Sequence, residues 1–215
     1  MLKPRSEYKA QAKQRMQGKY VNVIVIYLII SFITGLFNAP SFNSAIGQNG
    51  NIGYNILSVI TLVLAAGFAY ATTNMFIKVS KDEQPDLQEI LLSGFKNDFV
   101  RNLICHLLTL LFTFLWTLLF IIPGIIKAIA YSMNFYLMIK DPKLSGQDAI
   151  TKSKEYTQGY KGDLFGLYLS YLGWFILSLF TFGILLLWVV PKLKTAQMLY
   201  FDEIYAAKNP APKTV

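Results

Sequence analysis

The chain has 215 residues, of which 54% are hydrophobic and 15% are charged, and its formal net charge is +8. This composition excludes an ordinary soluble domain, because several apolar runs approach or exceed the ~20 residues that one transmembrane helix needs. A single cysteine, Cys105, excludes an intrachain disulfide, and a single histidine, His106, argues against a zinc site made of three or four Cys or His ligands.

The first 19 residues are basic, and we predict that residues 1–19 form an amphipathic cytoplasmic segment. Tyr8, Ala12 and Met16 follow the i, i+4 spacing of one helix face before Gly18. Similar cytoplasmic helices, each ending at a glycine, are expected before Gly94 and Gly159. Residues 20–207 are assigned to a transmembrane helical domain and residues 208–215 to a cytoplasmic tail.

Four apolar runs follow in chain order, at residues 20–37, 56–77, 103–139 and 164–190, and the third is long enough for two passes around Pro123. None of them alternates with a period of two residues, which argues against membrane strands. We therefore predict an all-α fold, a polytopic transmembrane bundle of six helices arranged as three pseudo-repeated hairpins with cytoplasmic amphipathic helices.

An internal repeat supports the hairpins, because residues 112–123 return as residues 180–191 with six of twelve positions identical, each copy ending in proline. In the second copy a turn at Pro191 would leave a charged return segment. We therefore expect the turn near Gly183, with Pro191 kinking the last helix. In the first copy, a turn at Pro123-Gly124 and a turn near residues 114–115 both remain open.

The lysines and arginines predict the orientation. They crowd the N-terminus and the connections at residues 78–101 and 140–161, whereas residues 38–55 carry no charge. Cytoplasmic loops retain basic residues because their translocation is costly. The N-terminus, the C-terminus and both basic connections are therefore expected in the cytoplasm.

Polar residues recur within the apolar runs and are candidates for the bundle interior. An amide or hydroxyl in lipid needs a partner, so these residues are expected either to join helices or to line a central path. For the lone histidine we favour packing over a proton relay, since no carboxylate chain accompanies it. The set is Thr72, Asn74, Ser132, Asn134, Thr195, Gln197 and His106.

Three lysines, Lys127, Lys192 and Lys194, follow the prolines, and no Asp or Glu lies within an apolar core to pair with them. Their ammonium groups either snorkel to the interface or form a cationic patch for an anionic substrate or lipid headgroup.

Residues 115–128, with the Pro123-Gly124 block, together with residues 131–133, 159–162 and 187–191, resemble a bacterial family catalogued as domain of unknown function 975. This resemblance implies a multi-pass protein with six-helix character in the bacterial cytoplasmic membrane, and it transfers no catalytic residues. The family is distantly similar to the membrane-embedded part of some glycerophosphodiester phosphodiesterases, whose soluble catalytic domain has no counterpart here. Lys192 departs from the family pattern, in which an aromatic residue follows the proline.

The sequence favours a non-enzymatic accessory or scaffold module that binds membrane lipids, another membrane protein or a second copy of itself. A small transporter or channel subunit for an anionic or amphipathic substrate is the alternative. No cofactor is expected, and paired carboxylates, a histidine cluster and a phosphate loop are all missing. Nucleic acid is not an expected partner, because the basic residues flank membrane segments.

Overall fold

The computed structural model describes residues 3–38, 51–96 and 99–209, and these residues form α-helices and connections without strands. The helices are, in chain order, α1 (Arg5–Arg15), α2 (Tyr20–Asn38), α4 (Asn51–Ser80), α5 (Leu87–Lys96), α6 (Phe99–Leu119), α7 (Ile121–Tyr131), α8 (Asn134–Lys140), α9 (Gly146–Thr157), α10 (Lys161–Leu169), α11 (Leu172–Phe180) and α12 (Leu186–Lys208).

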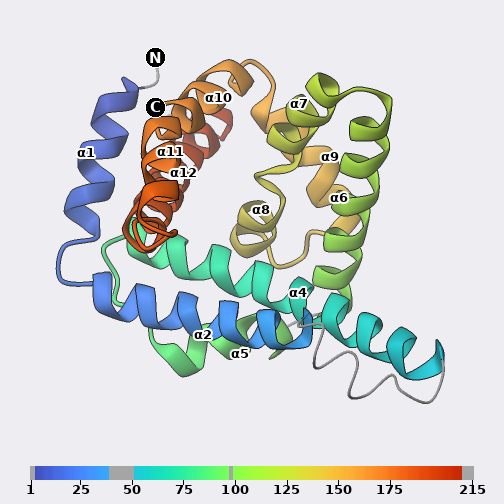
Figure 1. The fold of residues 1–215 in the computed structure, drawn as a ribbon. Coiled ribbons are helices and arrows are strands. Elements are labelled where there is room, and N and C mark those ends of the chain that lie inside the picture. Colours follow the sequence, from blue (N-terminus) through green and yellow to red (C-terminus); the bar gives the residue numbers. More distant parts are fainter. Residues whose placement is uncertain (1–2, 39–50, 97–98, 210–215) are drawn as a thin grey trace.

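Figure 1 shows how the helices pair. α2 lies along α4, α6 and α7 form a hairpin, and α1 runs beside α12, where the two ends of the described chain meet. The shorter helix α9 packs on α6, α7 and α8, and α8 also packs on α4 and α6. Large side chains from all these elements fill the core, including Met75, Tyr136 and Phe201.

By length and composition, four segments of the described chain could cross a membrane: Val59–Ser80, Phe99–Leu118, Ile121–Lys140 and Lys161–Phe180. A fifth arises if α1 and the first part of α2, bent by 93°, count as one span. The all-α fold with several apolar helices is therefore confirmed, but the structure gives four or five candidate spans rather than six. α12 is not among them, and its C-terminal half carries Asp202 and Glu203.

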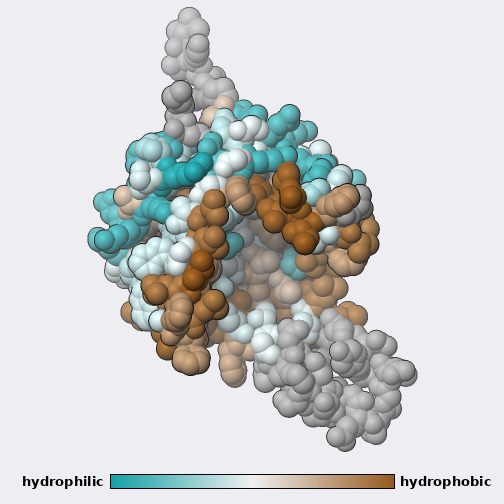
Figure 2. Space-filling view, turned by 45° about the horizontal axis from the view of Figure 1, so that its top comes forward, coloured by the Kyte–Doolittle hydropathy of each residue, from teal (hydrophilic) through white to brown (hydrophobic). Residues whose placement is uncertain are grey.

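The outer surface of the bundle is strongly apolar. Large hydrophobic side chains are exposed along α2, α6, α7 and α11, and Phe182, in the turn after α11, is 98% exposed. Figure 2 shows such side chains on both sides of a hollow, with polar side chains gathered toward the top of the view. An apolar surface of this extent suits hydrocarbon rather than water.

The two segments predicted to be repeats, residues 112–123 and 180–191, adopt different local structures. In the first, α6 continues to Leu119, the chain is extended at Phe120, and Pro123 lies in the first turn of α7, where its missing N–H costs nothing. In the second, α11 ends early, Gly183 has a φ of +82°, and Pro191 lies inside α12. Leu115 occupies the position equivalent to Gly183, and a side chain there disfavours the left-handed turn.

Of the three short helices expected to end at a glycine, α1 and α9 end just before Gly18 and Gly159, which both have positive φ. The expectation for Gly94 is wrong, because α5 continues through it to Lys96. A Cβ atom on Gly94 would collide with the backbone of Gly67 on α4, so the glycine allows close helix packing instead.

Candidate functional site

A cavity of about 490 Å³ lies among α2, α4, the α7–α8 junction, α10 and α12. This volume falls in the range of small-molecule sites. Its lining combines aliphatic and aromatic side chains with hydroxyls, one amide and one ammonium group: Tyr27, Ile30, Ser31, Thr34, Ala65, Phe68, Ala69, Thr72, Thr73, Phe76, Ser132, Phe135, Tyr168, Lys194, Gln197 and Met198.

Helix geometry places the polar lining. Tyr27, Ser31 and Thr34 are spaced i, i+4, i+7 on α2, so they share one face. The Thr73 hydroxyl donates to the Ala69 carbonyl at 2.9 Å, and Ser132 donates to Ile129 at 2.8 Å. These donors are satisfied within their own helices, which leaves the hydroxyl oxygens as acceptors toward the cavity.

Among the lining residues that the structure describes, Lys194 is the one with a charged side chain. Its Nζ donates to Oε1 of Gln197, one turn later on α12, at 3.4 Å. No carboxylate in the described part of the chain forms an ion pair with it. An ammonium group that is removed from water without a carboxylate partner is costly, so this position favours an anion.

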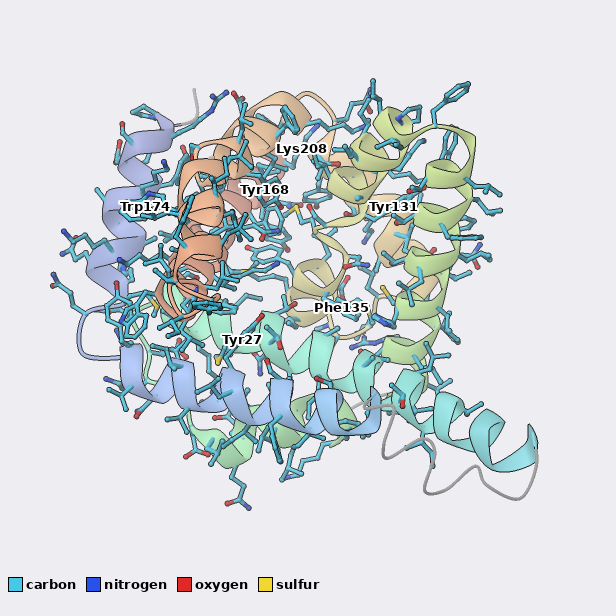
Figure 3. All side chains as sticks on the ribbon, in the orientation of Figure 1. Tyr27, Tyr131, Phe135, Tyr168, Trp174 and Lys208 are labelled. Atoms are coloured by element: carbon cyan, nitrogen blue, oxygen red, sulfur yellow. The ribbon has the colours of Figure 1, made fainter. Side chains whose placement is uncertain are left out.

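Aromatic rings form much of the remaining wall. Figure 3 shows Tyr27, Phe135 and Tyr168 around the same interior space, and they come from α2, α8 and α10. Together with Phe68 and Phe76 of α4 they provide apolar surface in the same cavity as the ammonium group. The cavity therefore combines a cation and hydroxyl groups with apolar surface.

The structure brings four of the predicted residues into this cavity: Thr72, Ser132, Lys194 and Gln197. Asn134 instead joins two helices, because its Nδ2 donates to the Thr109 hydroxyl of α6 at 2.7 Å. It is thus a packing residue.

Three further predicted interior residues lie outside the lining. Thr195 is fully buried, and no partner for its hydroxyl occurs among the described residues. Asn74 is half-buried on α4. His106 is half-buried, with its ring 6.3 Å from that of Phe135.

Lys127 and Lys192 do not join Lys194 in one patch. Lys127 places its ammonium 4.3 Å from the centre of the Trp116 ring, and Lys192 lies 5.7 Å from the Tyr20 ring. Both are cation–π contacts, which shield a cation without a counter-ion. Gly124, beside Lys127, allows α7 to approach Thr117 of α6 closely.

The sequence did not identify the residues that α2 and α10 contribute to the cavity lining. The i, i+4, i+7 pattern of Tyr27, Ser31 and Thr34 was a readable signal, because it marks a polar stripe on an apolar helix. Tyr168 offered no such signal, since only the tertiary fold turns it toward α12. The described residues contain no group of three or more His, Cys, Asp or Glu side chains that could hold a metal ion.

Comparison with known proteins gives one family. A family model described as "Protein of unknown function (DUF975)" matches residues 1–130 and 118–208. No curated protein matches the chain. No solved structure matches it either.

Proposed function

Since the chain belongs to the DUF975 family of proteins of unknown function, we propose from its cavity that it is a non-enzymatic, multi-pass membrane protein that binds an anionic amphiphile. The observation that carries this proposal is the ammonium of Lys194, which faces a cavity with apolar walls and pairs with no described carboxylate.

The cavity chemistry defines the ligand class. A carboxylate or phosphate group would receive a charge-assisted hydrogen bond from Lys194, and the amide nitrogen of Gln197 could donate a second one. The aromatic and aliphatic lining would accept an acyl or other apolar chain. Membrane lipids are the most abundant molecules with this combination, so we propose them as partners, with another membrane protein or a second copy as a further partner.

We propose a bacterial cytoplasmic membrane location with both termini in the cytoplasm. The positive-inside distribution supports this orientation. The meeting of the two ends also supports it, since the backbone N–H of Lys3 donates to Glu203 at 3.2 Å. The first described residue therefore lies next to the C-terminal part of α12.

The test compares Lys194→Gln with Lys192→Gln, which removes the same charge two residues away on α12. Each protein would be purified in a mild detergent and its bound amphiphiles identified by native mass spectrometry. We expect the wild type and Lys192→Gln to retain an anionic amphiphile and Lys194→Gln to lose it. Equal retention by all three proteins would reject the cavity as the binding site.

Helix breaks around the cavity favour a second candidate, transport of the same class of ligand. Short turns separate α7 from α8 at Ser132 and α10 from α11 at Ser170, and Pro191 lies inside α12. Broken helices often surround substrate sites in transporters. Flux of an anionic amphiphile into liposomes, lost in Lys194→Gln, would support transport, whereas binding without flux would support the binding module alone.

A further inference from the structure

A second hollow, of about 880 Å³, lies where α6 begins and meets the connection between α8 and α9. It is lined by two cations, Arg101 and Lys143, by the apolar Phe99, Val100 and Ile104, and by Ser145. It shares no lining residue with the Lys194 cavity.

Arg101 is held in place without a counter-ion. Its Nη1 donates to the carbonyl oxygens of Pro142 and Leu144, and its Nε is buried without a partner. No carboxylate in the described residues forms an ion pair with Arg101 or Lys143. The nearby Asp141 pairs with Lys152 and accepts the backbone N–H of Lys143 at 3.1 Å. The guanidinium therefore has N–H donors that no described acceptor satisfies.

An apolar stripe runs from this hollow along α6. Val100, Ile104, Leu107 and Leu111 are spaced i, i+4, i+7, i+11, and their exposed fractions are 66, 43, 38 and 50%. A stripe of this spacing is straight along the helix, and about 11 residues at 1.5 Å per residue give roughly 16 Å, the length of an acyl chain in one leaflet.

We propose that Arg101 and Lys143 bind the phosphate of an anionic phospholipid, whose acyl chain lies along the stripe on α6. The paired cations complement the headgroup, and the exposed stripe selects a lipid over a free anion. The positive-inside orientation places the site in the cytoplasmic leaflet, so the inference shares the membrane placement of the proposed function but not its ligand site.

The test uses the full-length protein in nanodiscs of phosphatidylcholine containing a small fraction of phosphatidylglycerol with a photoreactive acyl chain. After illumination, the labelled residues would be located by peptide mass spectrometry. We expect the label on Ile104, Leu107 and Leu111, reduced about tenfold in the double variant Arg101→Gln/Lys143→Gln, because two charged contacts are lost. Lys13→Gln, which removes an exposed lysine of α1, is the charge control and is expected to leave the labelling unchanged.

Lys143→Gln alone changes an exposed side chain and so tests the site without risk to folding; a loss of about threefold is expected. Labelling within twofold of wild type in the double variant would overturn the proposal, as would equal labelling by a photoreactive phosphatidylcholine. Complete displacement by millimolar inorganic phosphate would show an ion site rather than a lipid site and would also overturn it. Lys194→Gln is expected to leave this labelling intact, so failure of the two proposals can be told apart.

Discussion

At the corner between α1 and α2, the side chains of Arg15 and Lys19 both reach the carboxylate of Asp82, which follows α4. Lys19 is only 5% exposed, so its ammonium depends on this partner. Asp82 has a φ of +71°, a conformation that Asp and Asn tolerate better than most side chains. Asp82 therefore links the corner between α1 and α2 to the end of α4.

We predict that Asp82→Asn destabilises the protein at neutral pH and that this loss is smaller at pH 3. The hydrogen bond and charge of Lys19 lower the pKa of Asp82 in the folded protein. A lowered folded pKa contributes stability that is present above the unfolded pKa of about 3.9 and is lost as pH falls through the folded value. Asn preserves the backbone geometry, so the change isolates the charge.

Thermal unfolding in detergent at pH 7 and pH 3 would measure this effect. Glu83→Gln is the control, because Glu83 is an adjacent exposed carboxylate without an ion pair in the described structure. An equal loss of melting temperature at both pH values in Asp82→Asn would contradict the prediction.

At the scale of elements, close approach and chain breaks decide which helices meet. α5 packs closely on α4 through Gly94 and Gly67. α11 is followed by a turn in which Gly183 has a positive φ, a conformation that glycine adopts more easily than other residues. The acidic residues in the C-terminal half of α12 have partners on other helices. Asp202 accepts a hydrogen bond from the Tyr136 hydroxyl at 2.5 Å and forms an ion pair with Lys140 at 2.8 Å. The carboxylates of Asp202 and Glu203 therefore form tertiary contacts and are not unpaired charges exposed to lipid.

Gly94→Ala is expected to destabilise the protein by roughly 1–3 kcal/mol, because the added methyl group meets the backbone of Gly67 and must push α5 from α4. Gly162→Ala on α10 is the matched control, since nothing lies within 4 Å of its Cβ position. Alanine in a helix is favoured over glycine, so this control is expected to be neutral or slightly stabilising. Unfolding midpoints by fluorescence-detected size exclusion would separate the two; equal shifts would argue against the close contact.

The α11–α12 hairpin is expected to turn inside the bilayer. The charged helix α1 follows α10 to its end, where Lys9 donates to the Ser170 carbonyl at 3.0 Å. Beyond this point α11 has nine residues, about 13.5 Å, which is less than half of the ~30 Å hydrocarbon core. The exposed Phe182 at the turn would therefore contact acyl chains.

A cysteine at position 182, in a Cys105→Ser background, is expected not to react with a membrane-impermeant maleimide added to either side of vesicles. A cysteine at the exposed Lys13 is the reactive control. Labelling of position 182 from the outside would show instead that the hairpin spans the membrane.

At the scale of the whole molecule, the first and last helices close the fold. The Tyr8 hydroxyl donates to Glu203 at 2.5 Å, and the Tyr8 ring packs edge-on against Tyr200 with ring centres 5.0 Å apart. Burial, followed by the Glu203 carboxylate, raises the pKa of Tyr8, so the phenol stays protonated and keeps donating. Within the described part of the predicted N-terminal segment, residues 3–19, the side chains of Tyr8, Ala12 and Met16 are buried in the core.

A double-mutant cycle of Tyr8→Phe and Glu203→Gln is expected to give a coupling free energy of about 1–2 kcal/mol, because a hydrogen bond to a charged acceptor is lost. Equilibrium unfolding of the four proteins in detergent would measure it. Tyr8→Phe combined with Glu7→Gln should be additive, since Glu7 pairs with Lys3 instead. A Tyr8–Glu203 coupling near zero would mean that the contact does not hold α1 to α12.

The sequence by itself determined the helical class, the apolar segments and the distribution of basic residues, because each depends on local composition and periodicity. It also contained the reason why two similar segments turn differently, since Leu115 in the first stands where the second has Gly183. It identified polar residues within apolar runs, but it could not say which of them line a cavity.

Only the tertiary structure decided that question. Asn134 and Gln197 are chemically alike and occur in similar apolar settings, yet one pairs with Thr109 across a helix interface and the other lies beside Lys194. The direction in which a side chain points within a bundle depends on how helices from distant parts of the chain pack. Periodicity within one helix does not contain that information. Only the fold therefore shows the cavity, the bend between α1 and α2, and the contact between α1 and α12.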